Sequence, residues 1–111
     1  MTAFRFNPAE SIVVFQELFH EKFPFLRIQI VKDTGLKNHF QHENRPESEI
    51  QSEMTVRQVQ DLVMAFFGTE VRVMRGAGKT WVSCSRTQHW TLAVQNDAGH
   101  DMFVLLSNTD H

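Results

Sequence analysis

The sequence contains two segments that repeat one pattern, an amphipathic helix followed by a strand. Residues 15–23 read FQELFHEKF and residues 59–67 read VQDLVMAFF. The strands that follow, residues 26–28 and 71–73, read LRI and VRV. The helices are offset by 44 residues (15 to 59) and the strands by 45 (26 to 71). Either an internal duplication or the general likeness of any two amphipathic helix–strand pairs accounts for this pattern, and both predict helices packed on a sheet.

Capping signals set the expected ends of the two helices. Asn7 and Pro8 suit the cap and the first position of the first helix. Thr55 and Gln58 have the spacing of a capping box before the second helix, and Gly68 suits its end.

The remaining signals are shorter. A glycine-rich turn at 76–78 predicts a hairpin with a third strand at 80–85. Thr91 predicts the cap of a short helix that ends near Gly99. Residues 102–106 are an apolar segment that could be a strand or a helix turn. The expected fold is a two-layer α+β domain with order α-β-α-β-β-α. Its two long helices cover one face of a mixed sheet of three or four strands. If the first two strands are neighbours, they should be parallel, with a right-handed crossover between them.

The length of 111 residues predicts a single domain over the whole chain. Within it, the polar interval 33–53 is expected to be a mobile loop and residues 107–111 a frayed tail. The net charge of −2 gives no field that attracts nucleic acid or anionic membranes. The single cysteine excludes an internal disulfide, and neither a secretory signal nor an apolar run of membrane length is visible, which favours the cytoplasm. We expect no cofactor.

Two sets of residues are weak candidates for chemistry. His39 and His42 have the spacing of a metal-binding pair, but they fall in the polar interval, where solvated histidines are the simpler reading. Cys84, His89 and His100 could form a nucleophile and its base, although strand alternation favours a buried structural thiol for Cys84.

The strand alternation also predicts a candidate interaction face. If the apolar strand residues face the helices, then Arg27, Arg72, Met74 and Trp81 lie together on the opposite face. Trp and Arg are enriched in protein interfaces. Three arrangements would account for Trp81: a partner such as a second copy of the chain covers it; the 102–106 segment covers it; or a register shifted by one residue puts it in the core.

Residues 55–99 show a moderately specific pattern: a helix ending in Phe-Gly, a strand, a glycine turn, a strand bearing Trp, then Trp-Thr-Leu at 90–92 and Gln-Asn at 95–96. With the preceding helix–strand unit, this pattern resembles small uncharacterised bacterial α+β proteins. The resemblance leaves out residues 39–53. It implies a fold and no activity.

These observations favour a non-catalytic protein-interaction or self-association module, with a possible homodimer. The alternative is a small enzyme with a cleft lined by the histidines and the cysteine. A third class, weak binding of single-stranded nucleic acid by stacking on Trp81, is disfavoured by the net charge.

Overall fold

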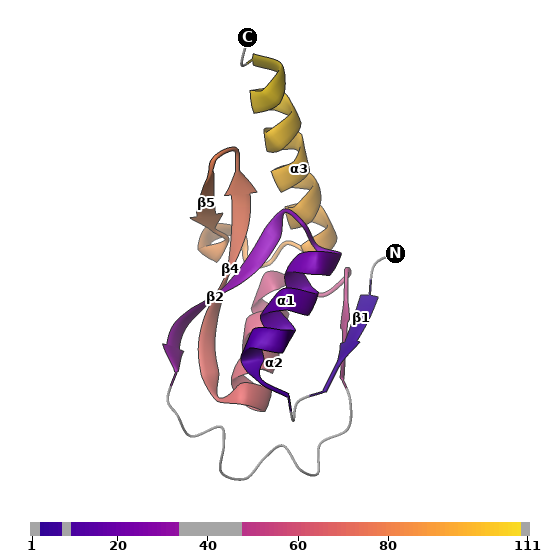
Figure 1. Cartoon of the computed structure of the whole chain (residues 1–111), viewed down its shortest axis with the longest axis vertical. Helices are drawn as coiled ribbons and strands as arrows, with labels where there is room; N and C mark the ends of the chain where they lie inside the picture. The colour runs from indigo at the N-terminus through magenta and orange to yellow at the C-terminus, as the bar shows by residue number, and fades with distance from the viewer. Residues whose placement is uncertain (1–2, 8–9, 34–47, 110–111) are drawn as a thin grey trace.

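The computed structural model describes residues 3–7, 10–33 and 48–109, without the side chains of 33 and 107–109. Its elements are β1 (Ala3–Phe6), α1 (Ile12–Lys22), β2 (Leu26–Asp33), β3 (Ser48–Gln51), α2 (Val56–Phe67), β4 (Thr69–Ala77), β5 (Thr80–Ser83), a short 3-10 helix η2 (Ser85–Thr87) and α3 (Leu92–Thr109). In Figure 1, α1 and α2 lie together against the β2–β4 pair, and α3 extends away from them along the long axis. The expected α+β class is confirmed.

The expectation of a mixed sheet is wrong. The three-stranded sheet has the order β2-β4-β5, and both of its strand pairs are antiparallel. Between β2 and β4 the chain forms an extra strand, β3, before α2, so it crosses the length of the domain once more than expected. It therefore enters β4 at the end where it leaves β2, and Asp33 at the end of β2 pairs with Thr69 at the start of β4.

A second, two-stranded sheet is formed by β1 and β3, two strands that the sequence patterns do not predict. The strands are antiparallel, with Phe4 opposite Ile50. Phe4 and Phe6 of β1 and Ile50 of β3 are buried in the core. Part of the interval 33–53, expected to be a loop, is thus a strand with a fully buried residue; residues 34–47 lie outside the described residues.

The strand register agrees with an internal duplication. The units β1-α1-β2 and β3-α2-β4 have the same order, and each strand pairs with its counterpart. Ile28 pairs with Val73, the residue 45 positions later that occupies the same place in the second unit. Likewise Arg5 pairs with Glu49, 44 positions later. An approximate two-fold axis therefore passes through both pairs.

Equivalent side chains support the same symmetry. Gln16 on α1 donates from Nε2 to the carbonyl oxygen of Ile28 at 2.9 Å. Its counterpart Gln60 on α2 accepts at Oε1 from the backbone N–H of Val73 at 3.1 Å. Each glutamine thus fixes its helix to the strand of its own unit, at the residue that lies on the axis.

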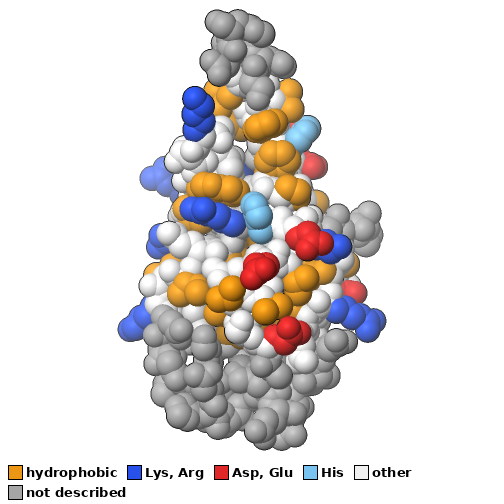
Figure 2. Space-filling view, in the orientation of Figure 1, with side chains coloured by type: hydrophobic (Ala, Val, Ile, Leu, Met, Phe, Trp, Pro, Cys, Tyr) orange, Lys and Arg blue, Asp and Glu red, His pale blue; other side chains and the backbone are white. Residues whose placement is uncertain are grey.

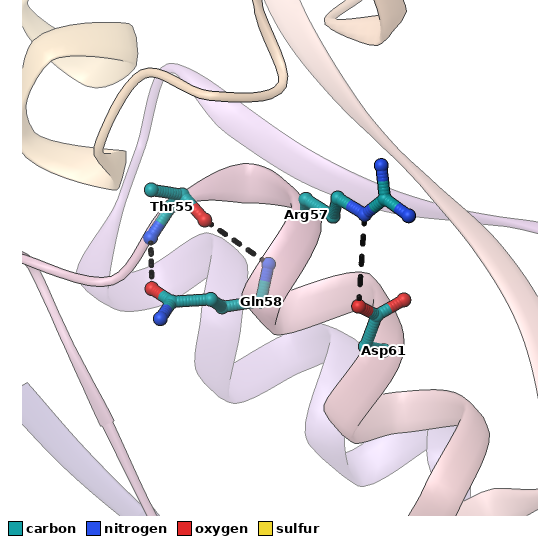
Figure 3. Close-up of polar contacts among 4 residues, drawn as sticks. All are labelled: Thr55, Arg57, Gln58 and Asp61. Atoms are coloured by element: carbon teal, nitrogen blue, oxygen red, sulfur yellow. Dashed lines mark hydrogen bonds and ion pairs between the residues drawn. The ribbon is translucent and has the colours of Figure 1, made fainter.

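The capping box of α2 is present as predicted (Figure 3). Thr55 Oγ1 accepts from the N–H of Gln58 at 3.1 Å, and Gln58 Oε1 accepts from the N–H of Thr55 at 2.8 Å. Gly68 ends the helix. The start of α1 differs from the prediction, because the helix begins at Ile12 with Ser11 as its N-cap.

The core combines both units. The apolar residues at helical or strand spacing in the two repeated segments are buried together: Phe15, Phe19, Phe23, Ile28, Val59, Val63, Phe67 and Val73. Phenylalanine rings connect the layers, with the Phe15 ring centroid 4.8 Å from that of Phe6 and 5.7 Å from that of Phe67. The phenylalanine-rich composition therefore serves packing, as Phe carries no polar group that needs a partner.

The last helix is longer than predicted. Thr91 caps α3 by accepting the N–H of Val94 at Oγ1, but the helix runs through Gly99 to Thr109. A Cβ on Gly99 would lie 2.8 Å from the Cβ of Phe25 and 3.3 Å from the Cγ of Arg75. Gly99 thus permits the close approach of α3 to the sheet rather than ending the helix.

Candidate interaction surfaces

The four residues of the predicted interaction face share one face of the sheet. Arg27 on β2 pairs with Met74 on β4, and Met74 pairs with Ser83 on β5. Arg72 and Trp81 each lie two residues along a strand from a member of this row, so they point to the same side. The Arg27 guanidinium carbon lies 4.7 Å from the centroid of the Trp81 ring. This cation–π contact joins the two outer strands of the sheet.

Trp81 is half-buried, in neither a core nor a bare surface position. The ring meets the edge of the His20 ring at a centroid distance of 5.9 Å and lies over Gly76, where no side chain intervenes. The neighbouring residue Arg75 points to the opposite face, where it contacts α3. As far as Leu106, where its side chains are described, α3 therefore packs on the other side of the sheet from Trp81 and does not cover it.

The candidate catalytic residues have different environments. Cys84 is buried, and that burial raises the pKa of its thiol to about 11, only partly opposed by the charge of Arg75. The thiol is therefore protonated at neutral pH and is a weak nucleophile. Both histidines are exposed: His89 meets the ring of Trp90, and His100 meets the ring of Phe25.

The candidate metal residues His39 and His42 lie outside the described residues. Among residues that the structure describes, no group of three or more His, Cys, Asp or Glu side chains could hold a metal ion.

A buried polar network fixes the base of α3. Gln95 is fully buried and accepts at Oε1 from Nη1 of Arg75 at 2.9 Å. Its Nε2 donates to the carbonyl oxygen of Thr87 at 2.8 Å and to Thr87 Oγ1 at 2.7 Å. The next residue of the helix, Asn96, accepts at Oδ1 from the N–H of Phe25 at 3.0 Å. With these polar groups satisfied, the base of the helix is held rigidly to the sheet.

Beyond this base, residues 102–106 form the surface that we call the α3 tip. They read MFVLL and are between 39% and 57% exposed. Successive residues of a helix are about 100° apart, so five in a row cover its whole circumference. The α3 tip is therefore apolar on every side. In Figure 2, hydrophobic side chains gather along α3 below its grey end, beside Lys and Arg side chains over the β4–β5 hairpin.

One side of the α3 tip touches the domain. Leu106 lies against Gly78 in the turn between β4 and β5, and Phe103 lies against Phe25 with ring centroids 5.8 Å apart. The other sides remain exposed. The tip is thus held in a fixed direction while about half of its apolar surface faces solvent.

The sequence contains one signal for this surface, the apolar run at 102–106. Gly99, just before the run, predicts that the helix ends there. In the structure Gly99 packs against Phe25 inside the helix, which continues and carries the run away from the core.

Comparison with known proteins finds no match: no family model, curated protein or solved structure is significantly similar to this chain. In the described part of the chain, no helix is both long enough and apolar enough to cross a bilayer.

Proposed function

We propose that the protein is a protein-interaction module that binds its partner through the α3 tip. The observation that supports this most is the exposure of a helical segment, residues 102–106, that is apolar on all sides. A segment of this kind is normally buried, because it has no polar face to turn toward water. Contiguous exposed apolar surface commonly marks a binding site.

The attachment of α3 supports the same function. The Gln95 network and the contact of Gly99 with Phe25 hold the base of the helix, and the hairpin supports its far end at Leu106. A surface presented in a fixed direction binds with a smaller loss of conformational entropy than a flexible one.

The face bearing Arg27, Arg72, Met74 and Trp81 is a second candidate surface, favoured by the stacking of Arg27 on Trp81. Because Arg27 already lies over the Trp81 ring, a nucleic-acid base stacking on that side would have to displace it. Its apolar members Met74 and Trp81 are half-buried, whereas residues 102–106 are all exposed, so we rank this face below the α3 tip.

Photo-crosslinking in cells tests the proposal. A benzophenone amino acid placed at position 105 should give a discrete crosslinked protein product. The control is position 13 on α1, since Val13 and Leu105 are similarly exposed at 53% and 57%. Equal, diffuse crosslinking from both positions would contradict the proposal.

A further inference from the structure

We infer that the chain has a second folded form, an intertwined dimer in which two copies exchange their β1-α1-β2 units. In this dimer the β1-α1-β2 unit of each copy packs on the β3-α2-β4 unit of the other, with the contacts that the two units make within one chain. Exchange of identical elements is a low-cost route to a dimer, because it needs no new surface. The inference is independent of the proposed function, since α3 follows the second unit and is not exchanged.

The strand pairing supports the exchange most directly. In the described part of the chain, the two strands of the β1-α1-β2 unit do not pair with each other, because β1 pairs with β3 and β2 pairs with β4. Both strand pairs of this unit therefore cross to the other unit. A second copy supplies the same partner strands in the same register.

The side chains of the first unit also depend on the second unit. The ring centroids of Phe6 and Phe15 lie 6.0 Å and 5.7 Å from that of Phe67 on α2. At the other end of the unit, the N–H of Phe25 donates to Oδ1 of Asn96 on α3 at 3.0 Å. A separate first unit would expose these rings to water, so it is stable only against a second unit, from its own chain or from another copy.

The connection between the units, residues 34–47, sets the balance between the two forms. Both forms contain the same contacts between units, so the monomer is favoured only by the concentration at which the connection holds one unit near the other. A connection of this kind gives an effective concentration on the order of 1 mM. The monomer should therefore predominate well below that concentration, and the dimer should become populated near it.

The place of the two sheets makes the length of this connection important. In Figure 1, α1 and α2 lie between the β2–β4 pair and the β1–β3 pair, and α1 contacts both β1 and β2. The chain from Asp33 on β2 to Ser48 on β3 thus has to pass a helix layer about 10–12 Å thick, and the strand backbones on its two sides lie further apart than that. A connection of two residues spans at most about 11 Å, so it should not close within one chain.

Refolding at two concentrations tests the exchange. Arg5 and Glu49 are register partners on β1 and β3, so Arg5→Cys combined with Glu49→Cys places two thiols within disulfide distance across the boundary between the units. The chain is unfolded in urea, refolded at about 10 μM or about 1 mM, and oxidised after refolding. The disulfide should form within one chain at the lower concentration. In the dimer fraction at the higher concentration it should join two chains, as a non-reducing gel would show.

The matched control is Met74→Cys combined with Ser83→Cys. These residues are register partners on β4 and β5, which belong to one hairpin and are not separated by the exchange. Their disulfide should therefore stay within one chain at both concentrations. If the cysteines at positions 5 and 49 also form only disulfides within one chain at the higher concentration, whether the protein is then monomeric or dimeric, the exchange is wrong.

Deleting residues 35–46 tests the role of the connection. By sedimentation equilibrium, the shortened chain should be a dimer at about 10 μM, roughly a hundredfold below the concentration that the wild-type chain needs. A folded monomer would contradict the exchange. The disulfide test keeps the connection at full length, so it decides the question even if the deletion prevents folding.

Discussion

Leu106 on α3 packs directly against Gly78 in the turn between β4 and β5. Gly78 has a φ of 70°, which L side chains rarely adopt, and a Cβ there would collide with the Cδ1 of Leu106. The contact thus links the position of the α3 tip to the conformation of the hairpin turn.

Gly78→Ala is expected to destabilise this contact. The left-handed conformation alone costs a non-glycine residue about 1–2 kcal/mol, and the collision adds to it. Hydrogen exchange should show faster exchange at residues 102–106, while the β2–β4 pair keeps its protection. Adding Leu106→Ala removes the collision but not the backbone strain, so the double variant should recover only part of the loss. Full recovery would mean that the turn is not strained.

Replacing residues 34–47 with a Gly/Ser linker of similar length is expected to change stability little, because the cost of loop closure varies slowly with length. Extending the replacement through Gln51 removes β3 and the fully buried Ile50. This second variant should unfold or melt far below wild type. Ile50→Ala alone should cost about 2–5 kcal/mol in urea unfolding, and the exposed neighbour Glu49→Ala should cost much less. Equal stability of the two replacements would show that β3 is dispensable.

The buried thiol predicts a loss of stability at high pH. Burial raises the pKa of Cys84 from 9.0 to about 11, so the unfolded chain releases the thiol proton before the folded chain does. The folded state then binds more protons, and the free energy of unfolding falls as pH rises from about 9 to about 11. Urea midpoints of wild type and Cys84→Ala, compared at about pH 8 and about pH 10.5, should converge at the higher pH. The absence of tyrosine simplifies the comparison. A constant difference between the two proteins would contradict the raised pKa.

Trp81→Glu separates the two candidate surfaces. Because Trp81 lies on the opposite side of the sheet from α3, the variant should stay folded and sediment as wild type does. Loss of the Arg27 contact should appear only as a modest fall in melting temperature. If Trp81→Glu converted a wild-type dimer into a folded monomer, the Arg27 and Trp81 face would be the interface instead.

The sequence predicted the parts of the fold that local patterns control. The helical spacing of Phe15 and Phe19, and the capping box at Thr55, depend on residues a few positions apart, and both appear as expected. Strand β3 could not be found in this way. It reads SEIQ, with one apolar residue, so it has no alternation to detect. Its conformation depends on pairing with β1, more than 40 residues earlier in the chain.

The two candidate surfaces differ in the same way, because one depends on a local pattern and the other on tertiary contacts. Strand alternation was enough to place Arg27 and Trp81 on one face. The direction of α3 was not predictable, because Gly99 is a common helix terminator in sequence and a close-packing residue in this structure. Which of these roles a glycine has depends on what lies against it.

The approximate two-fold symmetry has a consequence for how the chain unfolds. Neither the β1-α1-β2 unit nor the β3-α2-β4 unit contains a complete sheet, because β1 pairs with β3 and β2 pairs with β4. Melting either half would strip the hydrogen-bonding partners from the strands of the other, so the two halves should open in a single cooperative event. Residues 102–106 lie outside these strand pairs, so substitutions there should change the surface that α3 presents without changing how the two halves fold.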